Sequence, residues 1–282
     1  MRLTETLFQW INRISLTAYC CRVAAFSFLN AALAFATPYT ITNLGPLGGS
    51  VSEGQGINAS GEVAGGGCTA GNASTHAFLF TSGSIQDLGA LGGLNCIAYG
   101  ANAKRQVTGY AYSVGDASFR EILFTGGSMQ DPMSLGGPAF GYGIYGGGQV
   151  IGYSDTAVGC THAFLYKGGS MQDLGTLDGS SSSSYGTNAS GRVAGYSDAS
   201  YAADPQACVY DIVHGMVDLT RLIDPLSGWR LSRRLGIKTV SHITGWGRIN
   251  AAIRTRFCSP PLPRSPPPRA AAIYRSSPAC RR

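Results

Sequence analysis

One phrase returns almost unchanged in this sequence, and its recurrence limits the possible folds more than any other feature. Thr-His-Ala-Phe-Leu occupies 75–79 and again 161–165. After a glycine-containing turn, Gln-Asp-Leu-Gly follows at 86–89 and at 172–175. Self-similarity with a period of about 20–50 residues is typical of repeat architectures. The chain is therefore predicted to be a tandem array.

A second phrase fixes the period of the array. It begins at a glycine and reads Gly, six variable residues, Val or Ile, one residue and Gly, as in 56–65, where its turn is Asn-Ala-Ser-Gly. Asn and Gly tolerate the positive φ of tight turns, so the phrase predicts a β-hairpin. The anchor glycines are spaced 44, 43, 43 and 50 residues apart: Gly56, Gly100, Gly143, Gly186 and Gly236.

Each unit is expected to supply four short strands: the two of this hairpin, the His-Ala-Phe strand and the Asp-Leu-Gly strand. Glycine makes up 40 of 282 residues and charged residues only 13%, which favours short strands and tight turns. Four strands in about 44 residues match the blade of a β-propeller. We predict an all-β propeller of about five four-stranded blades over 37–250, the last blade incomplete, with a β-solenoid as the second choice.

The segment 39–49 ends in the same Leu-Gly-x-Leu-Gly-Gly phrase that closes a unit, but the beginning of that unit is missing. A ring removes the exposed edges that an open array would leave. The orphan strand at 39–44 is therefore expected to close the ring by pairing with 236–246.

Taken together, Gly-Ile-Asn-x-x-Gly-x-Val, His-Ala-Phe-Leu and Asp-Leu-Gly-x-Leu-Gly-Gly resemble the HAF repeat family of probable extracellular bacterial proteins. The resemblance covers about 210 residues, with the phrases in a fixed order. It implies a secreted repeat protein and no particular biochemical activity.

Residues 1–36 are expected to be a secretory signal peptide. An apolar run from Val23 to Ala36 follows Arg13 and Arg22, and small residues precede a cleavage site before Thr37. The run is too short to span a membrane comfortably. The predicted location is extracellular or periplasmic.

The segment 251–282 interrupts the pattern where the fifth unit requires a His-Ala-Phe strand. It is rich in proline and contains seven arginines and no acid. Reading two bases later, the codons of 251–258 permit Gly-x-Thr-His-Ala-Phe-Leu, so we interpret the end as frameshifted. Such a composition predicts a disordered tail.

The formal charge of +6 belongs to the two ends of the chain. Between 37 and 250 there are 11 Lys and Arg against 14 Asp and Glu. A repeat body without excess positive charge lacks the basic face that phosphate binding requires. We do not expect nucleic-acid binding, and we expect a monomer.

The cysteines have no CxxC motif or other paired metal-ligand spacing. A disulfide between Cys68 and Cys96 is one interpretation, and small buried thiols are the favoured one. No cofactor or metal site is predicted.

The histidine of the His-Ala-Phe strand is replaced by arginine in the second unit and by glutamine in the fourth. The next strand carries an aspartate at the same position in all four units. A catalytic base would occur at one position only, whereas this position recurs in every unit. Histidine, arginine and glutamine have in common only the capacity to donate hydrogen bonds. We therefore predict a structural pairing of donor and acid within each unit. The pairs are His76 with Asp87, Arg120 with Asp131, His162 with Asp173, and Gln206 with Asp218.

An aromatic residue follows the second anchor glycine in four units, at Tyr110, Tyr153, Tyr196 and Trp246. Such a series is suited to stacking on sugars, although packing between blades is the favoured interpretation.

Two functions remain open at this stage. The favoured one is a non-enzymatic binding module for a glycan or another cell-envelope component. The alternative is a polysaccharide hydrolase or lyase, which needs unrepeated carboxylates gathered at one site. Its candidates are Glu53, Asp116, Glu121 and Asp155.

Overall fold

The computed structural model describes residues 41–132, 134–188, 190–232, 236–237, 242–249 and, for the backbone, 253–258. The chain divides into two units, 1–43 and 44–282, and the fold lies in the second. The predicted signal peptide lies outside the described residues. Every regular helical segment in the described part is a short 3-10 turn, and no helix there has the length and apolar composition to cross a membrane.

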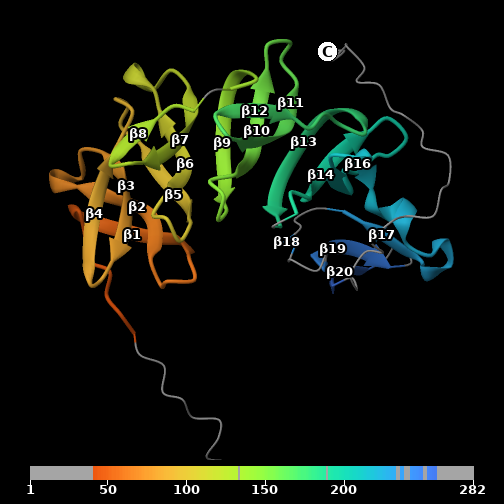
Figure 1. The fold of residues 1–282 in the computed structure, drawn as a ribbon, viewed down its shortest axis with the longest axis horizontal. Coiled ribbons are helices and arrows are strands. Elements are labelled where there is room, and N and C mark those ends of the chain that lie inside the picture. Colours follow the sequence, from red (N-terminus) through yellow and green to blue (C-terminus); the bar gives the residue numbers. More distant parts are fainter. Residues whose placement is uncertain are drawn as a thin grey trace, which may run out of the picture. The chain divides into compact units, whose positions relative to one another are not determined.

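The described fold is all-β, and its strands follow the predicted units (Figure 1). The first sheet has the order β1-β2-β3-β4. It contains β1 (Gly48–Ile57), β2 (Val63–Thr69), β3 (Thr75–Thr81) and β4 (Ser84–Gly89). The second sheet has the order β5-β6-β7-β8. It contains β5 (Cys96–Ala101), β6 (Val107–Tyr112), β7 (Phe119–Thr125) and β8 (Ser128–Gln130).

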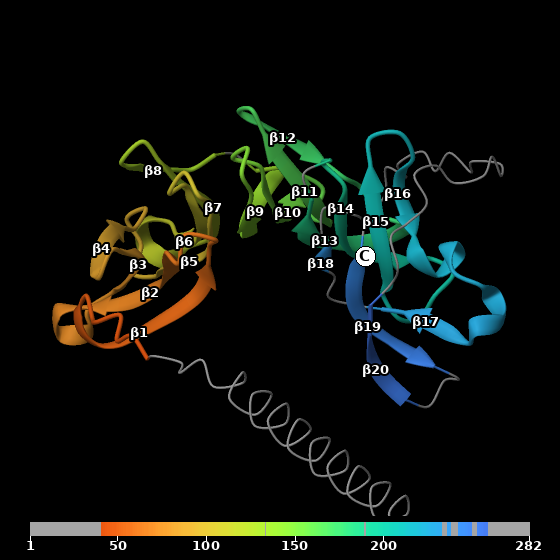
Figure 2. The ribbon, with the colours of Figure 1, turned by 60° about the horizontal axis from the view of Figure 1, so that its bottom comes forward.

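The third and fourth units repeat this pattern and are joined by a single parallel bridge, Thr161 to Ser181. The third contains β9 (Gly136–Ile144), β10 (Val150–Thr156), β11 (Thr161–Lys167) and β12 (Ser170–Asp173). The fourth contains β13 (Asp178–Thr187), β14 (Val193–Ala199), β15 (Gln206–Asp211) and β16 (Gly215–Asp218). Figure 2 shows the strands of both units from a second direction.

The last sheet is built around β19 (Ile243–Ile249). Its other strands are β17 (Trp229–Leu231), β18 (Gly236–Ile237) and β20 (Ile253–Cys258). β17 and β18 pair with successive parts of β19, and β20 pairs with its whole length. Both edges of β19 are thus occupied by strands of its own sheet, and 41–44 form no strand, so the predicted pairing with 236–246 is not formed by the residues that the structure describes. Residues 41–46 form no strand, and Leu47 instead bridges to Thr69 of the first sheet.

β20 also corrects the prediction that the whole segment 251–282 is disordered. Residues 253–258 form a strand, with Phe257 opposite Gly245. In the first sheet Phe78 of the His-Ala-Phe strand lies opposite Gly65 in the same way. This segment therefore supplies a strand next to β19, because β19 offers a free edge and Ile253–Cys258 is rich in residues that favour strands. Residues 259–282 lie outside the described part of the chain.

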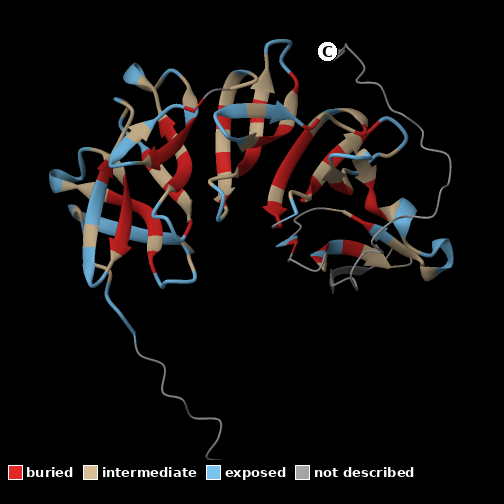
Figure 3. Cartoon of the chain, in the orientation of Figure 1, coloured by how far each residue is buried: buried red, intermediate tan, exposed pale blue. Residues whose placement is uncertain are grey.

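Apolar residues from neighbouring sheets form the core. The first strand of a sheet packs against inner strands of the sheet before it, as β5 does on β2 and β3, and β9 on β6 and β7. Figure 3 shows that the middle strands carry most of the buried segments, whereas fourth strands such as β4 and β12 are largely exposed. The core between the first two sheets contains Leu79, Leu88, Cys96, Val107 and Ile122.

The turns form as the glycine and asparagine pattern predicts. The hairpin between β3 and β4 has positive φ at Ser82 (52°) and Gly83 (84°), and its counterpart has Gly126 (60°) and Gly127 (84°). Two successive positive φ angles are the property of a type I′ turn, whose twist matches that of the flanking strands.

Candidate functional site

The first strands of the four complete units contain a β-bulge at one repeated position. Pairing with the second strand shifts between Gly54 and Gly56, and likewise in the next three units. A bulge inserts an unpaired residue and redirects its side chain. The bulged residues are Gln55, Tyr99, Tyr142 and Tyr185. The sequence prediction missed this position because the repeated phrase was defined from the anchor glycine that follows it.

The three bulged tyrosines join the aromatic residues of the second strands in one continuous cluster, which we call the aromatic row. Tyr142 lies at its centre, with its ring centroid 4.7 Å from Tyr185 and 4.8 Å from Phe140. Phe140 in turn stacks on Tyr110 at 4.7 Å. The row extends over three sheets and consists of Tyr99, Tyr110, Tyr112, Phe119, Phe140, Tyr142, Tyr153, Tyr185 and Tyr196.

The rings of the row are half-buried. Burial and the neighbouring Tyr185 raise the pKa of Tyr142, and burial with the nearby carboxylate of Glu53 raises the pKa of Tyr99. These two phenol groups therefore remain protonated at neutral pH and retain both a donor and an acceptor.

Three of the four residues proposed for glycan stacking belong to this row. Tyr110, Tyr153 and Tyr196 each contact an aromatic residue of a first strand. They therefore take part in packing between strands and sheets while remaining partly accessible. Trp246 lies on β19 and is 37% exposed.

The predicted donor and acid pair forms in three of the four units. His76 Nδ1 lies 2.9 Å from Asp87 Oδ2, and His162 Nδ1 lies 2.8 Å from Asp173 Oδ2. Arg120 donates to Asp131 over 2.9 Å. The three pairs are partly exposed, so each is expected to stabilise the fold by no more than about 1 kcal/mol.

The aspartate of the pair also accepts a hydrogen bond from the backbone, which the sequence did not predict. The N–H of Gly89 donates to Asp87, and that of Gly175 donates to Asp173. Burial acts to raise the pKa of Asp173, but the hydrogen bonds from His162 and from the Gly175 N–H outweigh it, so the pKa is lowered. The carboxylate thus caps the turn after its strand as well as binding the donor.

The fourth unit departs from the prediction. Gln206 donates to the carbonyl of Asp204, while Asp218 accepts from Tyr201 and from the N–H of Thr220. Asp218 is the N-cap of the 3-10 turn Leu219–Leu222. It keeps the capping role of Asp87 and Asp173, but another donor has replaced the predicted one.

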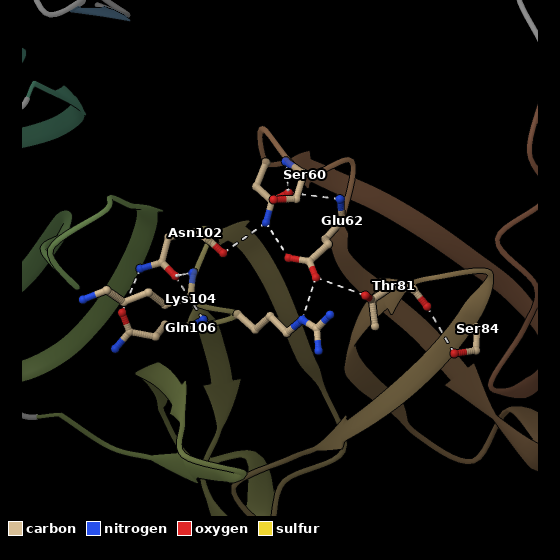
Figure 4. A network of polar contacts seen from close by, with 9 residues as sticks. Ser60, Glu62, Thr81, Ser84, Asn102, Lys104 and Gln106 are labelled. Carbon is tan, nitrogen blue, oxygen red and sulfur yellow. Dashed lines mark hydrogen bonds and ion pairs between the residues drawn. The ribbon is translucent and has the colours of Figure 1, made fainter.

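A repeated asparagine connects the first hairpins of the first two units to the unit that follows (Figure 4). Asn58 Oδ1 accepts from the N–H groups of Ser60 and Glu62, and its Nδ2 donates to the carbonyl of Asn102 over 3.0 Å. Asn102 repeats both roles and donates to the carbonyl of Tyr145. These side chains fix the turns and join successive units.

Glu62 strengthens the same network. Its carboxylate accepts from Asn58, from Arg105 over 2.7 Å and from Thr81. The hydrogen bonds from Asn58 and Arg105 lower the pKa of Glu62. The carboxylate is therefore ionised and structural.

Glu121 is a buried acid at a position where the other three complete units carry alanine. It is fully buried on β7, at the place taken by Ala77, Ala163 and Ala207 in the other units. Oε1 lies 3.5 Å from Thr108 Oγ1, and Oε2 has no hydrogen-bond partner among the described residues. Burial raises its pKa well above the ordinary value. Gly141 faces this side chain, because a Cβ there would lie 2.2 Å from Thr108 Oγ1 and 3.2 Å from Glu121 Cγ.

The other acids considered for hydrolysis have separate local partners. Asp155 accepts from Thr161, and Asp116 accepts from the N–H of Leu94. Glu53 is exposed on β1 and accepts from Gln55. Each therefore occupies a different structural setting.

Cys68 and Cys96 are free thiols, so the disulfide considered between them is not formed. Burial raises the pKa of the Cys96 thiol to about 12. Within the described residues, no group of three or more His, Cys, Asp or Glu side chains is arranged to hold a metal ion.

Comparison with known proteins finds similarity to solved structures but to no family model or curated protein. No protein-family model matches the chain, and no curated protein matches it. Among solved structures it is similar to TolB from Acinetobacter baumannii, with 13% identity and a TM-score of 0.47. The match covers 74% of this chain and 54% of the TolB chain, so it spans about half the length of that structure.

Proposed function

We propose that this chain is a secreted, non-enzymatic β-propeller of the HAF repeat type that binds glycans on the aromatic row. The observation that carries the proposal is the row itself. Nine half-buried rings extend over three sheets, and the seven tyrosines among them also supply hydroxyl groups. Aromatic rings with a polar end suit ligands that have both apolar faces and hydroxyl edges.

The propeller interpretation is supported by the order and packing of the sheets. Antiparallel four-stranded units follow one another along the chain, and the first strands of the second, third and fourth units pack on the unit before them. The binding role is favoured over hydrolysis because the candidate acids have separate partners and the repeated donor and acid pairs serve the fold.

A glycan array probed with the purified full chain tests the proposal, and a turnover screen on the same sugars accompanies it. We expect glycan binding without product release. Replacing Tyr142 with alanine, at the centre of the row, should weaken that binding about tenfold or more, while Tyr166→Ala on β11 provides a control outside the row. Release of reducing ends would support the hydrolase alternative, and an array without binding would contradict the glycan proposal. Detection of the protein in the medium or the periplasm tests secretion.

A further inference from the structure

The aromatic row ends before the first unit, where the positions that carry aromatic residues in the third unit hold smaller or polar residues. The bulged position holds Gln55 in place of tyrosine. Gly66 replaces the tyrosine of the second strand, opposite Glu53 of the first strand. At the corresponding first-strand position the third unit carries Phe140, which lies opposite Tyr153. Three rings that fill the third unit are thus absent from the first.

A hollow of about 190 Å³ lies at this interruption. Glu53 and Gln55 of β1 line it, with Gly66 of β2, Thr75 of β3 and Ile97 of β5. A Cβ on Gly66 would lie only 3.0 Å from Ile97 Cγ1 and 3.4 Å from Thr75 Cγ2, so these side chains approach because glycine is present. The hollow is smaller than the roughly 300–1,000 Å³ of sites for drug-sized ligands and suits one ring-sized group.

The lining of the hollow combines apolar walls with groups that bind hydroxyls. Glu53 Oε2 accepts a hydrogen bond from Gln55 Nε2 over 3.4 Å, and both side chains are exposed. A carboxylate accepts hydrogen bonds, while an amide both donates and accepts.

We propose that this hollow is a subsite for one neutral sugar ring, held by Glu53 and Gln55 beside Ile97. The sugar would occupy the position that rings fill in the third unit and would continue the row into the first sheet. Its hydroxyls would donate to the Glu53 carboxylate and exchange hydrogen bonds with the Gln55 amide, while its apolar face would contact the wall formed by Ile97. This subsite deepens the proposed glycan-binding function and rests on it.

Replacing Gln55 with tyrosine offers a direct test, because three other units already accommodate tyrosine at the same bulge. The new ring should fill the hollow without disturbing the backbone. The matched control is Gln86→Tyr, which introduces the same side chain at an exposed position of β4 in the same sheet. Glu53→Gln removes the charge while preserving the shape of the side chain.

The assay is isothermal titration of the full-length wild type and variants with cellotetraose, chitotetraose and xylotetraose, and with choline chloride as a cationic probe. We expect binding of at least one sugar, a loss of about tenfold or more in Gln55→Tyr, a smaller loss in Glu53→Gln and no change in Gln86→Tyr. Thermal unfolding of each variant verifies that it is folded.

The results separate the subsite from the broader function. Sugar binding that is unchanged in Gln55→Tyr but lost in Tyr142→Ala would overturn the subsite and leave the row as the binding surface. Binding of choline in preference to the sugars would overturn the neutral ligand. If neither these sugars nor the array binds the wild type, both proposals fail.

Discussion

Replacing Glu121 with glutamine should stabilise the protein, by an amount that grows as the pH rises. The carboxyl group is fully buried beside Thr108, and its Oε2 lacks a hydrogen-bond partner in the described part of the chain. Its pKa is raised in the folded state, whereas in the unfolded chain it is about 4.3. Between these two values the folded protein retains a proton that the unfolded protein has released.

The sign and size of the effect follow from proton linkage. In this interval the folded state binds one more proton than the unfolded state, so the free energy of unfolding falls as the pH rises. One proton corresponds to about 1.4 kcal/mol per pH unit. The stabilisation by Glu121→Gln, relative to wild type, should therefore grow by up to that slope above about pH 4.3 and level off above the folded pKa.

Urea denaturation of both proteins at half-unit steps from pH 4 to pH 8 measures this difference, and other titrating groups cancel in the comparison. Thr108→Val is a useful second variant, because it removes the hydrogen bond that favours the ionised carboxylate. The pH interval of the slope should then extend upward. A difference between wild type and Glu121→Gln that does not vary with pH would refute the reasoning.

Three further predictions concern other parts of the chain. Asp173→Asn should lower stability by about 0.5–1 kcal/mol at neutral pH, because it removes the carboxylate that binds His162. The pKa of Asp173 is lowered in the folded state, so this loss should diminish as the pH falls through that pKa. Urea denaturation in steps from pH 7 to pH 2 measures the trend, and a loss that does not change with pH would contradict the role of charge. Ser82→Gly should stabilise the fold by about 0.5–1 kcal/mol, because Ser82 has a positive φ of 52° that glycine adopts more easily. Gly126→Ser, at the equivalent turn position, should destabilise the fold. Thermal unfolding measures both variants, and changes of the same sign would count against the turn assignment. Resequencing the gene should reveal His-Ala-Phe in the alternative frame near codon 255, and its absence would disprove the frameshift.

The period of the repeats and the number of strands in each unit could be predicted because turn and strand residues recur at fixed positions. The pairing of His76 with Asp87 was equally accessible, because β3 and β4 form one hairpin in which Asp87 lies opposite Phe78, two residues from His76. The predicted pairing of Gln206 with Asp218 was wrong because Tyr201, from the preceding loop, donates to Asp218. A loop contact of that kind has no repeated signal in the sequence.

The aromatic row was only half visible in the sequence. The tyrosines of the second strands follow a glycine that marks their position, whereas Tyr99 and Tyr142 stand at bulges. A bulge changes the alternation of side chains by one residue, so simple period-two counting assigns such residues to the wrong face. The strand Ile253–Cys258 was missed because composition alone cannot show that a neighbouring strand offers a free edge.

The asparagine contacts between hairpins have a direction, and this direction matters while the chain is being synthesised. Asn58 donates to a carbonyl 44 residues later, and Asn102 to one 43 residues later. At about 5–20 residues per second, a ribosome takes roughly 2–9 s to supply each acceptor. The side-chain amide of a newly made hairpin already donates to a residue of its own turn, but its second hydrogen bond waits for the next unit. The order of synthesis thus sets the order in which the units can lock together.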